Sequence, residues 1–197
     1  MARVITFSRT FPAHHPKAGE PTYFVEKFWK SLWDQDKAHD IHYFQEPYDE
    51  LFHPWGKDLL NVHRFTGKHH TIRAGDRWKA GDYFSPRVWG TDVNPKSGKS
   101  GPYHSKQITI GPDIEIKKVW DFEIEPVLMK NVNPGDLYVF IKINGQNRWC
   151  NASIPDSGLV DRLAINDGLS VENFKAWFKW GKPFKGQIIC WNEQIEY

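Results

Sequence analysis

The chain has 197 residues, of which 40% are hydrophobic and 25% are charged. These proportions are typical of a globular protein and exclude a disordered or fibrous chain, and the length allows one domain with a substantial core. The formal net charge of +2 is too small to argue for nucleic-acid binding by itself. No apolar run reaches the ~18 residues of a membrane helix, and the N-terminus lacks a secretion-signal pattern. We therefore expect a cytoplasmic protein with no membrane association.

The aromatic residues and the cysteines indicate how the core is built and in which compartment the protein is expected. Ten tryptophans favour a compact core and leave aromatic surface for stacking on a base. Cys150 and Cys190 are the two cysteines and form no Cys-x-x-Cys pair, so free, buried thiols in a reducing compartment are expected. Because no His-Glu-x-x-His or Cys-x-x-Cys motif occurs, the sequence predicts neither a metal site nor a cofactor.

The first third of the chain predicts one strand and one helix. Apolar residues between Val4 and Phe7 indicate the strand. Pro21 and Thr22 then precede apolar residues at helical spacing, which run from Phe24 to Trp33. Residues 36–66 have no clean period but many aromatics, which predicts an ordered connection or a helical insert.

The rest of the chain has mainly β-strand patterns. The expected strands are 83–89, 105–110, 114–124 with a bulge near 117–118, 137–143, a partner through 148–150, and 187–191. Asn144-Gly145 predicts a tight hairpin, and 90–101 is a polar loop. Helices are expected at 158–166 and 171–180, the second capped by Ser170. Short strands with a few helices, in no βαβ rhythm, predict an α+β barrel.

The most informative segment is Gly67 to Arg73, which places Lys68, Thr71 and Arg73 within six residues. Side chains of an extended segment alternate between two faces, so Thr71 and Arg73 are expected to point the same way. A basic, hydroxyl-bearing ledge suits a polar, planar or anionic ligand, and it also suits a nucleophile beside a cation.

This Lys-x-x-Thr-x-Arg pattern, followed by Gly81-Asp82, resembles the ASCH domain, a branch of the PUA-like β-barrels. A second match is Asn166–Ser170, ahead of the expected helix 171–178, so the resemblance covers residues 64–191. It implies one ASCH/PUA-like domain over 1–197: a small α+β barrel with flanking helices and an N-terminal helical elaboration at 1–63. The family is commonest in bacterial and phage proteins.

The resemblance implies recognition of RNA or of a modified nucleobase in a cleft between 67–73 and 166–170. DNA and free nucleosides are alternative ligands. Besides Lys68, the residues expected to face the ligand are Arg73, His70, Trp78, Tyr103, Lys106, Asn166 and Ser170.

Two other functions stay open. Some ASCH proteins are amidohydrolases that act on N4-acetylcytidine, and by that resemblance Thr71 is the nucleophile, Lys68 its base and Asp167 the acidic residue. A threonine hydroxyl needs an adjacent base, and a lysine serves only when its pKa is lowered. Asp167 is one methylene shorter than the glutamate of those enzymes. The third alternative is a protein-interaction module that uses the aromatic N-terminal half.

Overall fold

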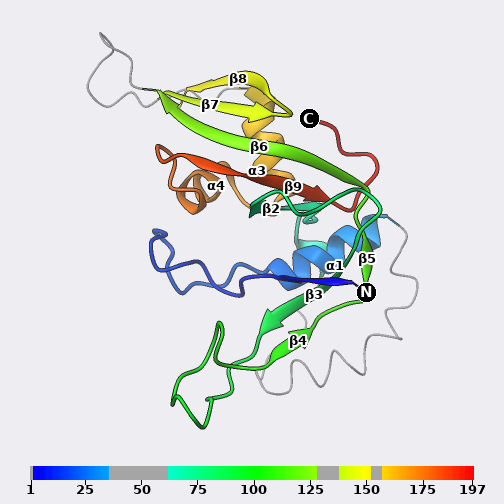
Figure 1. Ribbon diagram of the computed structural model, residues 1–197, viewed down its shortest axis with the longest axis vertical. Coiled ribbons are helices and arrows are strands. Elements are labelled where there is room, and N and C mark those ends of the chain that lie inside the picture. Colours follow the sequence, from blue (N-terminus) through cyan, green and yellow to red (C-terminus); the bar gives the residue numbers. More distant parts are fainter. Residues whose placement is uncertain (1, 36–61, 128–137, 152–156) are drawn as a thin grey trace. The chain divides into compact units, whose positions relative to one another are not determined.

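A computed structural model describes residues 2–35, 62–127, 138–151 and 157–197, with the side chains of 127, 138, 147–151 and 157 excepted. The described elements are a few helices and a larger number of strands, which confirms the α+β class (Figure 1). Most of the expected 36–66 connection lies outside the described residues, and its described end is the 3₁₀ helix η2, Val62–Arg64. The buried state expected for Cys150 concerns a side chain outside them, whereas Cys190 is a buried free thiol.

The chain groups into two compact units. Unit 1 contains the described residues of Met1–Ala13, Lys17–Gly67 and Asp82–Glu115, and unit 2 those of His14–Pro16, Lys68–Gly81 and Ile116–Tyr197. Residues 82–115, which the resemblance assigns to the ASCH core, therefore group with the N-terminal segment.

The described residues of unit 1 form a small mixed sheet and one α-helix. Strand β3, Tyr83–Trp89, pairs in parallel with β1, Arg3–Thr6, and antiparallel with β4, Gln107–Thr109, and β5, Ile114–Glu115. Helix α1, Phe24–Asp34, places Phe28 in the core with its ring centroid 5.5 Å from that of Phe7. A Cβ on Gly111 would lie 2.9 Å from the Phe28 ring, which explains the glycine there.

Helix α1 begins where the sequence predicts, at the Pro21-Thr22 step. The backbone of Tyr23 is left-handed, with φ 57°, and its side chain does not cap the helix. The Phe24 N–H instead donates to Thr22 Oγ1 at 3.3 Å, and that hydroxyl donates to the Ser8 carbonyl at 2.6 Å. Lys27 Nζ donates to the Thr22 carbonyl at 2.9 Å. The helix start is thus tied to the loop after β1.

Unit 2 is built on a five-stranded antiparallel sheet in the order β2-β9-β6-β7-β8. These strands are His70–Ala74, Phe184–Cys190, Lys118–Val127, Tyr138–Ile143 and Gln146–Asn151. The predicted Asn144-Gly145 hairpin is confirmed: both residues have positive φ, 49° and 75°, and they join β7 to β8. Strands β2 and β8 form the edges of the sheet, so within the described residues the expected closed barrel is not found.

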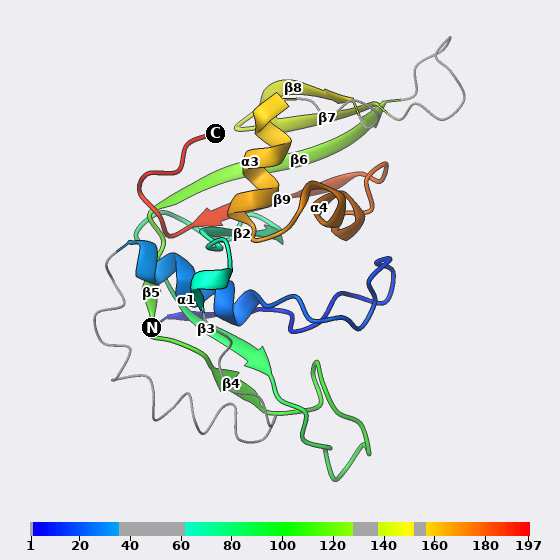
Figure 2. The same ribbon diagram turned by 180° about the vertical axis from the view of Figure 1, so that it is seen from behind.

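Two helices cover one face of this sheet, α3, Ser157–Asn166, and α4, Val171–Trp177 (Figure 2). Leu163 of α3 and Phe174 of α4 are fully buried. The Phe174 ring lies 4.9 Å from Phe178, whose ring is 6.1 Å from Phe122 of β6. This aromatic layer fixes the α3–α4 turn against the sheet, and that turn carries Asp167.

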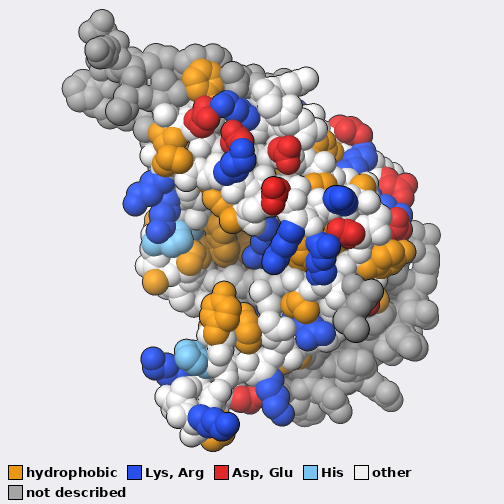
Figure 3. All heavy atoms as spheres, viewed as in Figure 1, with side chains coloured by type: hydrophobic (Ala, Val, Ile, Leu, Met, Phe, Trp, Pro, Cys, Tyr) orange, Lys and Arg blue, Asp and Glu red, His pale blue; other side chains and the backbone are white. Residues whose placement is uncertain are grey.

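Charged side chains of both signs alternate over strands β6, β7 and β9 (Figure 3). Lys185 pairs with Glu123 at 2.7 Å, and Lys142 pairs with Glu125 at 2.7 Å. Exposed pairs of this kind contribute little stability. They mark a solvated face rather than a ligand site.

One predicted strand is wrong. Residues 114–124 do not form a single bulged strand, because β5 ends at Glu115 in unit 1 and β6 begins at Lys118 in unit 2. Between them Ile116 is fully buried, and its carbonyl accepts from the Gly81 N–H at 2.8 Å. Apolar and charged residues continue to alternate across this break, so the sequence pattern does not indicate that the chain passes from one sheet to the other.

Candidate ligand-binding site

Backbone hydrogen bonds bring the two motif segments together in unit 2. The His69 N–H donates to the Asn166 carbonyl at 2.7 Å, and the Trp191 N–H donates to the His69 carbonyl at 3.2 Å. The residues just before β2 therefore lie between the end of α3 and the end of β9. This is the juxtaposition that the sequence predicts for 67–73 and 166–170.

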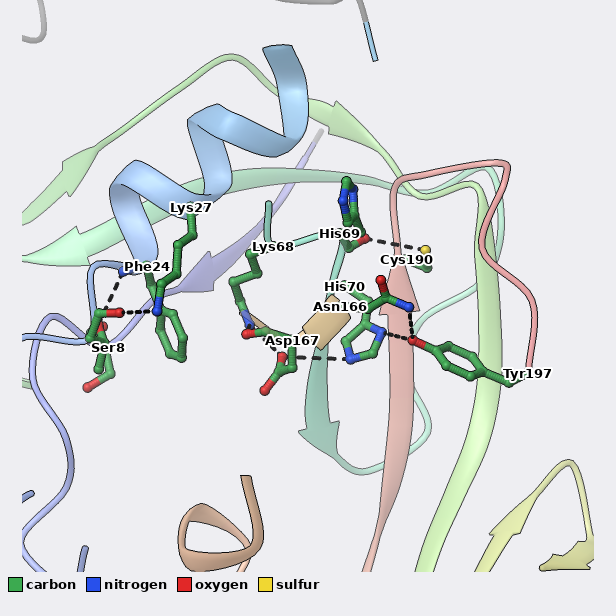
Figure 4. Close-up of polar contacts among 11 residues, drawn as sticks. Ser8, Phe24, Lys27, Lys68, His69, His70, Asn166, Asp167, Cys190 and Tyr197 are labelled. Atoms are coloured by element: carbon green, nitrogen blue, oxygen red, sulfur yellow. Dashed lines mark hydrogen bonds and ion pairs between the residues drawn. The ribbon is translucent and has the colours of Figure 1, made fainter. Parts of the chain in front are cut away.

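Lys68 and Asp167 form a buried ion pair at this junction (Figure 4). Lys68 Nζ donates to Asp167 Oδ1 and also to the Asp167 backbone carbonyl, at 2.7 Å. Lys68 is 1% exposed and Asp167 is 4% exposed. A carboxylate and a carbonyl at this distance favour the ammonium form of the amine, and the desolvated pair depends on both partners.

His70 lies beside this pair and belongs to a separate hydrogen-bonded chain with Tyr197 and Asn166. The Asn166 Nδ2 amide donates to the Tyr197 hydroxyl at 2.9 Å, and that hydroxyl lies 2.7 Å from His70 Nδ1. His70 Nε2 faces the Asp167 carboxylate, with Oδ1 at 3.9 Å, and this negative charge favours the tautomer with the ring proton on Nε2. Nδ1 then accepts from the Tyr197 hydroxyl. We call Lys68, His70, Asn166, Asp167 and Tyr197 the Asp167 cluster.

Burial sets the protonation states in this cluster. Burial, with added repulsion from Lys68 and His69, holds the pKa of His70 well below its ordinary 6.5, so the imidazole is neutral at pH 7. Burial also raises the pKa of Tyr197 above its ordinary value, so the phenol remains protonated. Each group therefore keeps the proton that the hydrogen-bonded chain requires.

The sequence did not indicate Tyr197 or Trp120. The Tyr197 ring lies 5.1 Å from Trp120 in a T-shaped contact and 5.5 Å from His70. Trp120 belongs to a strand whose alternation is ordinary, and Tyr197 is separated from His70 by 127 residues. No local pattern links residues so far apart.

Thr71 and Arg73 alternate with His70 and Ile72 along β2, as expected of a strand. Thr71 is buried, but its hydroxyl is not hydrogen-bonded to Lys68 or Asp167. Burial lowers the pKa of Arg73, while Asp167 raises it and Arg77 lowers it further. Arg73 thus lies within electrostatic range of the carboxylate, whereas Thr71 makes no polar contact with its expected base.

Two other expected ligand contacts have structural roles. Trp78 is buried, and its backbone is held by Gln187, with N–H to Oε1 at 3.0 Å and Nε2 to carbonyl at 3.3 Å. Ser170 caps α4, because its hydroxyl accepts from the Asn173 N–H at 3.3 Å. The sequence predicts this cap correctly, and the bond occupies the hydroxyl that was expected to face a ligand.

Tyr103 and Lys106 belong to unit 1, in the loop between β3 and β4. Tyr103 is 88% exposed, has a left-handed φ of 66°, and its ring lies 5.4 Å from that of Trp89. Lys106 is exposed as well. Both residues are available to a partner of unit 1.

Over the described ranges, no group of three or more His, Cys, Asp or Glu side chains is arranged to hold a metal ion. A search of the same ranges finds no helix with the length and apolar character needed to cross a bilayer.

Comparisons of the chain with protein-family models, with curated proteins and with solved structures gave no match. The ASCH resemblance thus remains an expectation from two short motifs. The geometry of the Asp167 cluster has to support the functional proposal.

Proposed function

We propose that unit 2 recognises a nucleobase, in RNA or as a modified nucleoside, at the Asp167 cluster. One observation carries the proposal: His70 Nε2 is fully buried, and within the described residues it has no hydrogen-bond partner. Its distance to Asp167 Oδ1, 3.9 Å, exceeds hydrogen-bond length. An unsatisfied buried donor costs about 1–3 kcal/mol, and an acceptor atom on a ligand would recover that cost.

The polar groups beside His70 suit the edge of a cytosine-type base. A carboxylate such as Asp167 accepts a hydrogen bond from the exocyclic amino group of cytosine. A neutral imidazole with its proton on Nε2 donates to the adjacent ring nitrogen or carbonyl of the base. Lys68 holds the carboxylate in place and keeps it charged. Aspartate and histidine thus form an acceptor next to a donor, the complement of this base edge.

The hydrolytic alternative receives less support from the same geometry. Lys68 has to remove a proton from Thr71 in that mechanism, and the Asp167 carboxylate favours the protonated amine instead. The Thr71 hydroxyl also lacks a hydrogen bond to Lys68. We therefore assign the Asp167 cluster to binding. The binding experiment described next also tests whether the protein hydrolyses N4-acetylcytidine.

The test is a calorimetric titration of the wild type and Asp167→Asn with cytidine, N4-acetylcytidine and uridine. We expect cytidine to bind, and Asp167→Asn to weaken its binding by about tenfold or more, because one charge-assisted hydrogen bond contributes about 1.5–3 kcal/mol. Uridine should bind more weakly, since it presents a carbonyl to the carboxylate. Thermal melting establishes that Asp167→Asn is folded, and chromatography of the N4-acetylcytidine sample should detect no cytidine.

The proposal fails if the wild type binds none of these nucleosides and no RNA oligonucleotide. Equal affinity for cytidine and uridine would contradict the assignment of Asp167 to the amino group. Release of cytidine by the wild type, lost in Lys68→Met, would replace binding by hydrolysis.

A further inference from the structure

We infer that Tyr197 fixes His70 as a hydrogen-bond donor toward the ligand, and thereby selects a base that has an acceptor next to its amino group. Tyr197 is a positioning residue in this arrangement and does not touch the base. Its hydroxyl lies at Nδ1 of the imidazole, whereas Asp167 faces Nε2 (Figure 4). The inference rests on the proposed function and adds to it a residue that determines specificity, 127 positions from His70 in the sequence.

The Tyr197 hydroxyl fixes the orientation of the imidazole. A histidine ring can flip about the bond that joins it to Cβ, which exchanges each ring nitrogen for a carbon. In the observed orientation Nδ1 lies 2.7 Å from the Tyr197 hydroxyl, and Nε2 faces Asp167 Oδ1 at 3.9 Å. The flipped ring would present a C–H to each of these groups and lose the hydrogen bond at Nδ1. The hydroxyl therefore keeps Nε2 directed at the carboxylate.

The same hydroxyl favours one of the two neutral tautomers. With the ring proton on Nε2, Nδ1 accepts from Tyr197 and the N–H faces the Asp167 carboxylate. With the proton on Nδ1, a bare Nε2 would face the carboxylate, and the phenol proton would need another acceptor. Among the described residues the hydroxyl contacts Asn166 Nδ2, which is a donor, and His70 Nδ1. Only the first tautomer satisfies these contacts.

Contacts on the ring and on the neighbouring backbone hold Tyr197 in place. Its ring lies 5.1 Å from that of Trp120, with 79° between the ring planes. Lys118 Nζ donates to the Ile195 carbonyl at 3.0 Å and pairs with Glu196, which fastens the segment after β9. Figure 1 shows this segment, in red, turning back from the end of β9. Burial raises the pKa of Tyr197, so the hydroxyl keeps the proton that it donates.

A fixed N–H on His70 decides which base edge fits the Asp167 cluster. Cytosine presents an amino donor beside an unprotonated ring nitrogen, which complement the Asp167 carboxylate and the His70 N–H. Uracil presents a carbonyl beside a protonated ring nitrogen, which is the opposite pattern at both atoms. A bare Nε2 would instead accept from the uracil ring N–H. Loss of the fixed tautomer should therefore reduce the discrimination between the two bases.

The tautomer is measured on the ligand-free protein, from the NMR chemical shifts of the His70 ring nitrogens, which separate a protonated nitrogen from a bare one. We expect the proton on Nε2 in the wild type. Tyr197→Phe keeps the ring against Trp120 and loses only the hydroxyl, so it should show both tautomers. Tyr83→Phe, at an exposed tyrosine of unit 1, is the matched control and should give wild-type shifts.

Calorimetric titrations with cytidine and uridine measure the effect on the ligand. Tyr197→Phe should weaken cytidine binding about three- to tenfold, the effect of one neutral hydrogen bond, and should weaken uridine binding less. A purely structural role of Tyr197 would weaken both equally. Lys118→Gln loosens the segment after β9 and leaves the Asp167 cluster intact. It should act in the same direction by about twofold, and it decides the question if thermal melting shows that Tyr197→Phe is unfolded.

A proton on Nδ1 in the wild type would overturn this inference and leave the proposed function intact. A single Nε2 tautomer with unchanged affinities in Tyr197→Phe would do the same, as would equal weakening of cytidine and uridine binding. No binding of either nucleoside by the wild type would overturn the proposed function and the selective role together. The shifts of the ligand-free protein test the tautomer independently of that result.

Discussion

At the buried pair Lys68–Asp167, one substitution is expected to cost more stability than two. Lys68→Met leaves the Asp167 carboxylate buried without its cation, which typically costs about 3–5 kcal/mol. The double variant Lys68→Met/Asp167→Asn removes both charges and should recover most of that loss. The free energy of unfolding in urea, measured for Lys68→Met, Asp167→Asn and the double variant, checks this expectation.

The exposed pair Lys142–Glu125 is the control. Its N–O distance is 2.7 Å, but the Glu125 side chain is 49% exposed, so Lys142→Met should cost less than about 1 kcal/mol. If the losses of Lys68→Met and Asp167→Asn simply add in the double variant, the two groups are not coupled and the cluster is wrongly described.

His70 predicts a pH dependence of stability. Its pKa in the folded protein lies well below 6.5, mainly because of burial, whereas the unfolded chain takes up this proton near pH 6.5. Below that pH the unfolded state therefore binds more protons, and stability present above pH 6.5 is lost as the pH falls. The slope from this one residue is about 1.4 kcal/mol per pH unit, until the folded state is also protonated.

Unfolding free energies of the wild type and His70→Gln between pH 7.5 and 5.5 isolate this contribution. The variant is expected to be less stable at pH 7.5 but to have a shallower slope. The same slope in both proteins would mean that His70 takes up its proton in the folded state as readily as in the unfolded chain.

Sequence alone indicated part of the Asp167 cluster. Lys68, His70, Asn166 and Asp167 were expected from two motifs, and they do lie together. The role of His70 was not predictable, because its partner Tyr197 is 127 residues away and belongs to no motif. Motifs indicate which residues carry chemistry, whereas their partners depend on how the chain folds back.

At the scale of elements, Gly186 is expected to be essential for the edge of the unit 2 sheet. A Cβ at this position would lie 2.1 Å from the Arg73 carbonyl oxygen, on the paired strand β2. Gly186→Ala should therefore separate β9 from β2, cost at least about 1–3 kcal/mol, and displace His70 from the cluster. The free energy of unfolding in urea and the affinity for cytidine should both decrease.

Gly158→Ala is the matched control in α3. The nearest atom to its added Cβ is the flexible end of Arg162, at 3.3 Å, and alanine is favoured over glycine in a helix by about 1 kcal/mol. The free energy of unfolding of Gly158→Ala should be unchanged or slightly higher than that of the wild type. A neutral Gly186→Ala would contradict the close approach of the two strands.

Elements with local signals were predictable. The Ser170 cap and the Asn144-Gly145 hairpin depend on neighbouring residues, and both are confirmed. The break between β5 and β6 is a tertiary event, since it depends on which sheet each half joins. Closure of a barrel also depends on which strands pair across the fold, and the positions of the strands in the sequence do not determine that pairing.

At the scale of the whole molecule, each unit is assembled from separated stretches of chain. His14–Pro16 belong to unit 2, although their neighbours on both sides belong to unit 1. His14 Nε2 contacts the Trp177 carbonyl at 3.1 Å, and His15 Nε2 contacts the Asn173 carbonyl at 3.2 Å, so both bind α4. A boundary drawn along the sequence therefore cannot separate the units.

The net charge of +2 gives the molecule little overall attraction for RNA, so salt-dependent binding has to come from a local surface. The loop between β3 and β4 offers one, with Tyr103 exposed and lysine and histidine side chains gathered over it (Figure 3). Its exposed lysines are Lys96, Lys99 and Lys106. The loop is ordered by its own contacts, among them Ser105 Oγ to the Asp92 carbonyl at 2.6 Å.

These lysines predict how the RNA binding proposed above would depend on salt. Each phosphate neutralised on a single strand contributes about −0.7 to the slope of log K against log salt, so three lysines predict a slope of about −2. Replacing all three by glutamine should bring the slope close to zero, whereas Tyr103→Ala should lower affinity by about 1–3 kcal/mol at an unchanged slope. Fluorescence anisotropy of a labelled RNA between 50 and 200 mM salt, about the range over which such slopes are resolved, measures the slope and the affinity.

The control is the double variant Lys79→Gln/Lys182→Gln, which replaces two exposed lysines of unit 2 and should behave as the wild type. If that control flattens the slope and the loop variant does not, unit 2 rather than the loop holds the phosphates.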